Sequence, residues 1–307
     1  MPAQQPKKID SSWTLTKAAW GALRSVTSIH WLASIGLACL VFAFSLWIII
    51  MIMNPSDALY TSSSIKTPDG FAAELSFTSL TWVSILVTFA LLGIASTFIT
   101  GAIVHAAIQS FKGKKTSATT SLAAVWRRGL PLAVFALVNI GVGQLISYIN
   151  NRMSPTGGLV LSILGDAAWG VATFFAIPVI MTEDTPQWPI QTTKKSLNII
   201  KKVWGESLIS GVTIGAVGAF IGVLYGIVGG IIIIVLVSVG NAPLTIAGIS
   251  LLGVGLAAII VITSTLSAIL KAALYYYATT GLSPINFNKT MLRAAFTPKK
   301  AERIFSV

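Results

Sequence analysis

Long apolar runs recur along the chain and are separated by short polar segments. A helix needs about 20 apolar residues to cross the hydrocarbon core of a bilayer. Lipid offers no partner for backbone N–H and C=O groups, so spans of this length must be helical. The pattern predicts an all-α, polytopic membrane protein with six transmembrane helices, at 29–53, 79–108, 130–149, 159–181, 207–239 and 244–278.

Prolines stand where several of these runs begin or bend. Pro131 and Pro243 fall in the first turn of the third and sixth spans, where a residue without N–H is tolerated. Pro178 lies inside the fourth span and predicts a kink near its inner end. The last two runs are longer than a bilayer requires. They predict either long tilted helices or, in the fifth span, a break at Gly229 and Gly230.

The amino-acid composition agrees with an integral membrane protein. Hydrophobic residues make up 54% of its 307 positions and charged residues only 10%, with a mean hydropathy of +0.82. A soluble domain has roughly 25% charged residues, so most of this surface must face lipid. We expect one membrane domain over 11–296, a disordered tail over 1–10 and a second tail over 297–307.

The basic residues are distributed unevenly about the predicted spans. Of the 21 Lys and Arg residues, only Lys66 and Arg152 fall in the segments on one side. The positive-inside rule therefore places both termini in the cytoplasm, with the protein in the cell membrane. Basic residues near a membrane surface attract anionic headgroups, at about 1 kcal/mol each. We therefore expect anionic lipid as the partner of the +12 net charge, and not nucleic acid, because no basic domain remains to bind it.

The polar segments at the basic side have helical periodicity. In 190–204 the lysines occupy one arc and the apolar residues the other, and 13–24, 116–128 and 285–296 divide in the same way. Basic helices with tryptophan at the edge fit helices that lie in the membrane interface. The residues expected to contact the lipid interface are Lys17, Trp20, Arg24, Trp126, Arg127, Arg128, Lys194, Lys195, Lys201, Lys202, Trp204 and Lys271.

One carboxylate lies clearly inside a predicted span. Charged side chains within a membrane are costly and are functional candidates. Asp166 is that residue, and Asn139, Gln144 and Arg152 are its expected partners in a polar core. A proton- or ion-coupling role is one interpretation. We favour a structural role, because a single acid without a second titrating group does not make a relay.

Glycines recur at every fourth position in the fifth span, at Gly218, Gly222, Gly226 and Gly230. Such a ridge allows another helix to approach closely. We expect this ridge to pack against 244–278 of the same chain, and contact with a second copy of the chain is the alternative.

Signatures of enzymes and metal sites are absent from the sequence. It lacks the phosphate-binding, hydrolase and zinc-protease motifs, and Cys39 is its single cysteine. His105 lies at an inner helix end, where we interpret it as an interfacial anchor, and 54–78 reads as a solvated loop with a turn at 67–70. We expect no catalytic residue, no bound metal and no cofactor.

Three stretches carry a resemblance to a known family. They cover 12–20, 165–178 and 266–281, so they are spread over nearly the whole chain. This sequence resembles a prokaryotic family of six-helix integral membrane proteins known only as a domain of unknown function. The resemblance implies the six-helix topology and a prokaryotic cell membrane, and it implies no substrate, cofactor or catalytic residue.

Two functions are consistent with these patterns. The first is a non-enzymatic membrane scaffold or assembly partner that binds anionic lipid and a membrane or cytoplasmic protein. The alternative is a channel or transporter with a pathway near Asp166, Asn139 and Gln144.

Overall fold

The structure is a computed structural model of the chain. It describes residues 8–53, 60–67, 70–77, 79–153, 155–185, 188–204, 213–240, 242–284, 287 and 292.

Ten helices and two strands form the described part of the fold. Six long helices follow the predicted spans: α2 (Thr27–Met53), α4 (Ser79–Phe111), α6 (Gly129–Asn150), α7 (Pro155–Ala172), α10 (Thr213–Ser238) and α11 (Ala242–Thr280). The short helices are α1 (Lys8–Ser25), α5 (Ala118–Arg127), α8 (Ala176–Thr182) and α9 (Pro189–Trp204), and the strands are β1 (Tyr60–Thr67) and β2 (Gly70–Phe77).

Several of the helices are suited to a membrane. By length and composition, five helices of the described chain could cross one, with α7 and α8 counted together. A sixth is added if α1 and α2, which meet at an angle of 96°, are counted as one broken span. The prediction of several long apolar helices is therefore confirmed.

The segment 54–78 contains more structure than the predicted loop. Strands β1 and β2 pair antiparallel, from Tyr60 opposite Phe77 to Thr67 opposite Gly70. Tyr60, Thr61, Ile65 and Thr67 in β1 are residue types that favour strands. The two residues between the strands, which belong to the predicted turn, lie outside the described residues.

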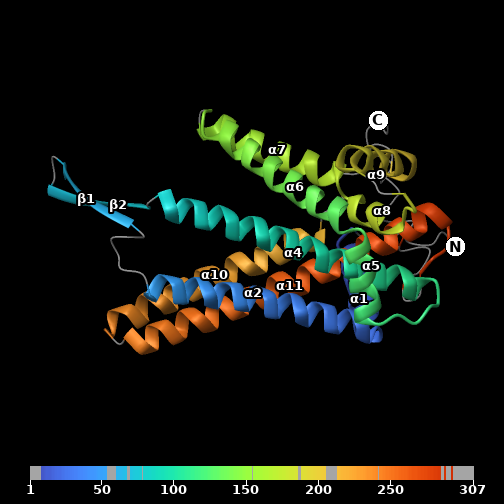
Figure 1. The fold of residues 1–307 in the computed structure, drawn as a ribbon, viewed down its shortest axis with the longest axis horizontal. Helices are drawn as coiled ribbons and strands as arrows, with labels where there is room; N and C mark the ends of the chain where they lie inside the picture. Colours follow the sequence, from blue (N-terminus) through green and yellow to red (C-terminus); the bar gives the residue numbers. More distant parts are fainter. Residues whose placement is uncertain are drawn as a thin grey trace, which may run out of the picture.

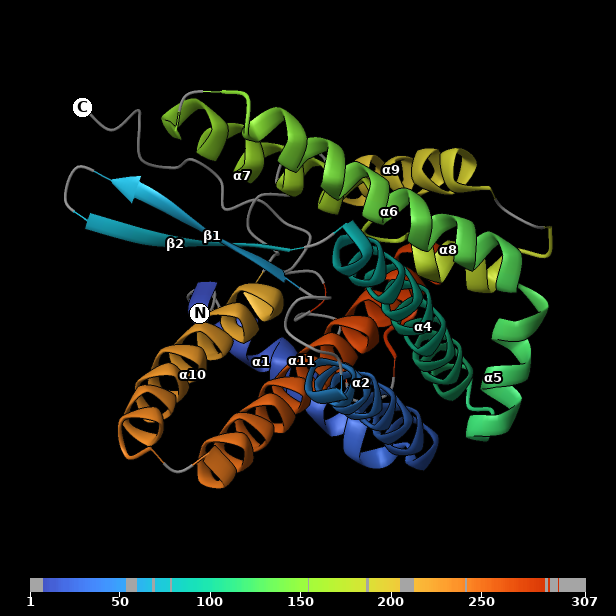
Figure 2. The same ribbon diagram turned by 60° about the vertical axis from the view of Figure 1, so that its left-hand side comes forward.

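The short helices gather at one end of the bundle (Figure 1). We call the end formed by α1, α5, α8 and α9 the basic end. The β1–β2 hairpin and the α6–α7 and α10–α11 connections lie at the opposite end. Helix α4 contacts α2, α6 and α11, and Figure 2 shows the α6–α7 pair and the α10–α11 pair on different sides of it.

The buried core lies toward the basic end. In α4 the fully buried residues begin at Gly101, and in α6 they lie between 131 and 136. Toward the other end the long helices expose large apolar side chains, such as Phe42 (71% exposed), Ile234 (70%) and Leu251 (73%). Extended apolar surface of this kind marks contact with lipid or another apolar partner.

The fourth predicted span is interrupted, as Pro178 predicted. Helix α7 ends at Ala172 and α8 begins at Ala176. Because proline has no N–H, Pro178 cannot continue the regular hydrogen bonding of α7. The amide of Phe175 donates to the buried hydroxyl of Ser196 in α9, at 3.0 Å. By contrast, α10 continues through Gly229 and Gly230 without a break.

Candidate functional site

The three residues of the predicted polar core do not meet. Asp166 is exposed, and the hydroxyl of Ser162 lies 3.4 Å from its Oδ2 atom. The indole N–H of Trp169 donates to the Oδ1 atom of Asn139 at 2.7 Å, and Gln144 is exposed. Asn139 therefore joins α6 to α7 and does not join a site with Asp166.

Arg152, the other expected partner of Asp166, forms no ion pair with it in the described part of the chain. Its guanidinium carbon is 4.7 Å from the ring centroid of Tyr148. This contact belongs to the connection between α6 and α7.

The glycines of α10 have different surroundings. A Cβ atom on Gly226 or Gly230 would have open space, and one on Gly222 would only just reach Leu256 of α11. A Cβ atom on Gly229 would lie 2.8 Å from a methyl carbon of Leu252. Gly229 thus makes the close contact with α11, and the surroundings of Gly218 lie outside the described residues.

The predicted lipid-contacting residues also divide into groups. Arg24 lies over the ring of Trp20, at 5.4 Å, and Trp126 is 79% exposed. The exposed basic side chains of the set are Lys17, Arg24, Arg127, Lys194 and Lys201. The side chains of Lys202 and Trp204 lie outside the described residues.

Other basic residues of this set contact the protein itself. Lys195 forms an ion pair of 2.6 Å with Glu183, and Lys271 lies 5.4 Å from the ring centroid of Phe174. Tyr275 is 6% exposed, and its hydroxyl lies 2.7 Å from that of Thr182. These contacts tie α8, α9 and α11 together.

The predicted helix at 285–296 falls mostly outside the described residues. Of that segment, Phe287 and Leu292 are described, and both are buried. The ring of Phe287 packs edge-on against Phe111 of α4, with centroids 6.1 Å apart. These two side chains belong to the core.

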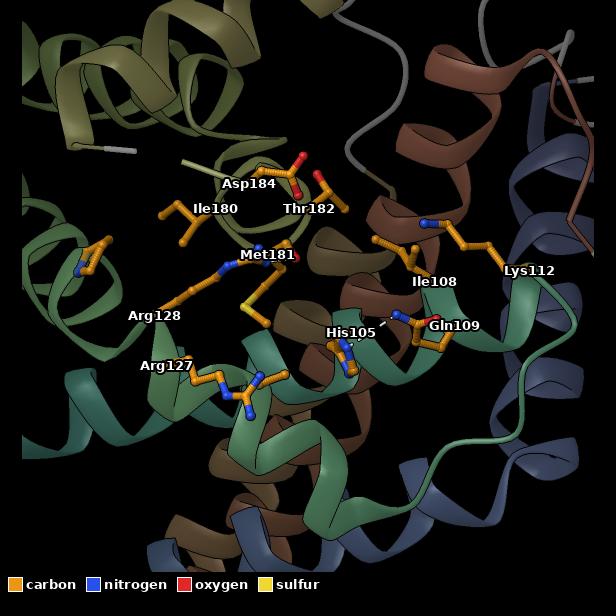
Figure 3. A pocket seen from close by; sticks show the side chains of 12 residues that line it. His105, Ile108, Gln109, Lys112, Arg127, Arg128, Ile180, Met181, Thr182 and Asp184 are labelled. Atoms are coloured by element: carbon orange, nitrogen blue, oxygen red, sulfur yellow. Dashed lines mark hydrogen bonds between the residues drawn. The ribbon is translucent and has the colours of Figure 1, made fainter. Parts of the chain in front are cut away.

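A cavity of about 500 Å³ opens at the basic end, between α4, α5, α6 and α8 (Figure 3). Its polar lining comes from His105, Gln109, Lys112, Arg127, Arg128, Thr182 and Asp184. Its apolar lining comes from Ile108, Ala124, Pro131, Ile180 and Met181. We call this cavity the basic pocket.

Arg128 fixes one wall of the basic pocket. Its guanidinium donates from Nη1 to the carbonyl of Met181 and from Nη2 to the carbonyl of Glu183, the latter at 2.7 Å. The last carbonyls of a helix lack partners within the helix and carry partial negative charge. Arg128 thus closes the end of α8 while keeping its positive charge beside the cavity.

A chain of polar side chains begins in the lining of the basic pocket. The Nδ1 atom of His105 is 3.2 Å from the hydroxyl of Ser121, and its Nε2 atom is 3.4 Å from the amide nitrogen of Gln109. The buried hydroxyl of Ser28 donates to the carbonyl of Thr116. These contacts hold α5 and the loop before it against α4 and α2. His105 therefore joins α4 to α5, and the interpretation of it as an interfacial anchor was wrong.

The comparisons with known proteins identify a family. The model of a family of unknown function (DUF6159) matches residues 79–285. The chain belongs to this family. The match runs from α4 to the end of α11 and contains every residue that lines the basic pocket. No curated protein and no solved structure matches the chain.

In this DUF6159 member, sequence reasoning missed the basic pocket. It treated Arg127 and Arg128 as equivalent lipid contacts and left Gln109, Lys112 and Thr182 unassigned. A usable signal was present, because residues 105, 109 and 112 follow the i, i+4, i+7 spacing of one helix face. Among the described residues, no group of three or more His, Cys, Asp or Glu is placed to hold a metal ion.

Proposed function

We propose that the chain is a non-enzymatic membrane scaffold whose basic end binds the anionic headgroups of the bilayer. The observation that carries this proposal is the gathering of α1, α5 and α9 at one end of the bundle, with exposed cations on each. The long helices that leave this end expose apolar side chains. Together these features suit a bundle that spans the bilayer and meets headgroups at the basic end.

The orientation and the location belong to the same proposal. The basic end faces the cytoplasm, both termini lie on that side, and the membrane is a prokaryotic cell membrane. A membrane or cytoplasmic protein partner would assemble at this end, where polar side chains are available for contact. The β1–β2 hairpin lies on the other side.

The geometry favours a scaffold over a channel or transporter. A pathway near Asp166 would require it to share an interior with Asn139 and Gln144. Instead, Asn139 is bonded to Trp169, while Asp166 and Gln144 lie on exposed faces. Flux through proteoliposomes that is lost in Asp166→Asn, with the amount of protein unchanged, would reverse this preference.

Lipid preference tests the scaffold. The full chain is reconstituted in mixtures of neutral and anionic phospholipid, and the lipids that remain bound after mild detergent extraction are identified by mass spectrometry. We expect enrichment of anionic lipid, and a loss of about 1 kcal/mol of this preference for each cation removed at the surface. The variant is Lys194→Gln with Lys201→Gln, both exposed on α9.

The control keeps the charge, as Lys194→Arg with Lys201→Arg. Equal lipid composition in the glutamine and arginine variants would contradict the proposal, as would neutral lipid alone bound to the wild type. Orientation is tested separately by labelling from outside in a Cys39→Ser background. Ser63→Cys should react with an impermeant maleimide and Lys114→Cys should not, so labelling of both or of the second alone would refute the topology.

A further inference from the structure

The basic pocket has features that general attraction to a membrane surface does not require. Its volume of about 500 Å³ falls within the range of small-molecule sites, roughly 300–1,000 Å³. Three basic side chains, Lys112, Arg127 and Arg128, line one cavity. A surface that only attracts headgroups needs exposed cations and no cavity.

The described residues do not balance the positive charge of the pocket. Asp184 is the one carboxylate among the described lining residues, so three cations and one anion leave a net charge of +2 with His105 neutral. The nearby carboxylate of Glu183 is already paired with Lys195. In the described part of the chain, neither Lys112 nor Arg127 has an ion pair, and both are exposed.

The polar lining is rich in hydrogen-bond donors. Guanidinium and ammonium groups form strong, charge-assisted bonds with phosphate oxygens, and hydroxyl and amide N–H groups add neutral ones. Gln109 supplies an amide group in the same cavity, whereas the hydroxyl of Thr182 donates to the carbonyl of Pro178 at 2.8 Å. The contacts of Gln109 with His105 and of Arg128 with α8 hold two of these donors in place.

Part of the lining is apolar. Ile108, Pro131, Ile180 and Met181 contribute to the cavity wall. A cavity lined by both charged donors and apolar side chains matches a ligand that carries a phosphate together with hydrocarbon. We infer that the basic pocket is a specific binding site for a phosphate group, carried either by a phospholipid headgroup or by a soluble phosphate ester.

This inference rests on the proposed function, because the basic pocket lies at the end of the bundle that would meet the headgroups. Its test is separate from the test of the scaffold. The full chain is placed in nanodiscs of neutral phosphatidylcholine. One arm titrates glycerol 3-phosphate and follows binding by calorimetry. The other arm adds phosphatidic acid to the disc and counts bound lipid by native mass spectrometry, with sulfate at equal ionic strength as the reference anion.

The variants remove equal charge inside and outside the pocket. Lys112→Gln with Arg127→Gln removes two cations that line it, and Lys114→Gln with Lys115→Gln removes two exposed cations from the neighbouring loop. We expect phosphate binding to weaken roughly tenfold or more in the first variant and to change less than about twofold in the second. Gel filtration and thermal unfolding confirm that both variants fold, and the charge-preserving Arg127→Lys should retain most of the binding.

Each outcome of this experiment either supports or overturns the phosphate site. Saturable binding in the lipid arm alone assigns the site to a headgroup, and binding in the soluble arm assigns it to a phosphate ester. If phosphate binding weakens equally in the two double variants, the cations attract phosphate only nonspecifically. That result overturns the inference and leaves the scaffold proposal intact. Absence of saturable binding in both arms also overturns it. Glycerol 3-phosphate binding without any enrichment of anionic lipid would support the site and contradict the scaffold.

Discussion

Arg127 and Arg128 are neighbours in sequence, and their replacement should have very different effects. Arg128 is half-buried and bonds the carbonyls of Met181 and Glu183. Arg127 is exposed, and its side chain has no hydrogen bond or ion pair in the part of the chain that the structure describes. The perturbation is Arg128→Gln, and Arg127→Gln is its control of equal charge.

The expected loss follows from the two hydrogen bonds of Arg128. A hydrogen bond to a charged group contributes about 1.5–3 kcal/mol. Because the side chain is only half-buried, water replaces part of this energy in the variant. We therefore expect Arg128→Gln to lower the free energy of unfolding by about 2–3 kcal/mol, and Arg127→Gln to change it by less than about 0.5 kcal/mol.

Thermal unfolding in a mild detergent, followed by tryptophan fluorescence, measures the difference. For a chain of this size, the loss corresponds to a fall of about 3–5 °C in Tm for Arg128→Gln. Native gel filtration after heating provides an independent reading of the folded fraction.

Equal Tm values for the two variants would refute the reasoning, because the bonds of Arg128 to α8 would then contribute nothing measurable. A larger fall in Tm for Arg127→Gln than for Arg128→Gln would mean that Arg127, and not Arg128, makes the stabilising contact.

Two further predictions concern packing and hydrogen bonding between helices. A Cβ atom on Gly255 would lie 2.7 Å from Cζ of Tyr225, whereas one on Gly230 would have open space, so Gly255→Ala should be less stable than Gly230→Ala by about 1–3 kcal/mol. The two alanine variants have the same helix propensity, so equal unfolding curves would contradict the close contact between α10 and α11. Tyr275→Phe removes the hydroxyl contact with α8 and should lower stability by about 1 kcal/mol. The hydroxyl of Tyr276 forms no hydrogen bond among the described residues, so Tyr276→Phe should leave stability almost unchanged. Denaturant titration measures the free energy of unfolding of both variants, and equal losses would contradict the role given to the Tyr275 hydroxyl.

Local patterns predicted the helices well for a physical reason. The thickness of a bilayer and the need to satisfy backbone hydrogen bonds act on consecutive residues, so a long apolar run specifies a long helix wherever it packs. Pro178 acts locally too, and the interruption before α8 follows from its missing N–H. The hairpin in 60–77 was not predicted because β1 is rich in serine and threonine and lacks a regular apolar alternation. In β2 the alternation of Phe71, Ala73, Leu75 and Phe77 was a usable signal.

Tertiary structure decided which polar groups meet. Asn139 was expected beside Asp166, yet the rotation of α7 brings Trp169 to Asn139 and leaves Asp166 exposed. Similarly, Gly229 and Gly230 are adjacent, and only the first contacts α11 closely. Sequence spacing places a residue on a helix face, but the approach of a neighbouring helix determines what that face contacts.

The sequence by itself determined that the chain is a set of long apolar helices with cations concentrated in particular connecting segments, because hydropathy and charge are properties of consecutive residues. Only the fold gathered Lys112, Arg127, Arg128 and Thr182 around one cavity. These residues come from α5, α8 and the ends and connections of neighbouring helices, and their separations along the chain carry no information about distances across the bundle. The packing of α8 beside α4 and α6 brings them together, and that packing depends on contacts between segments far apart in sequence.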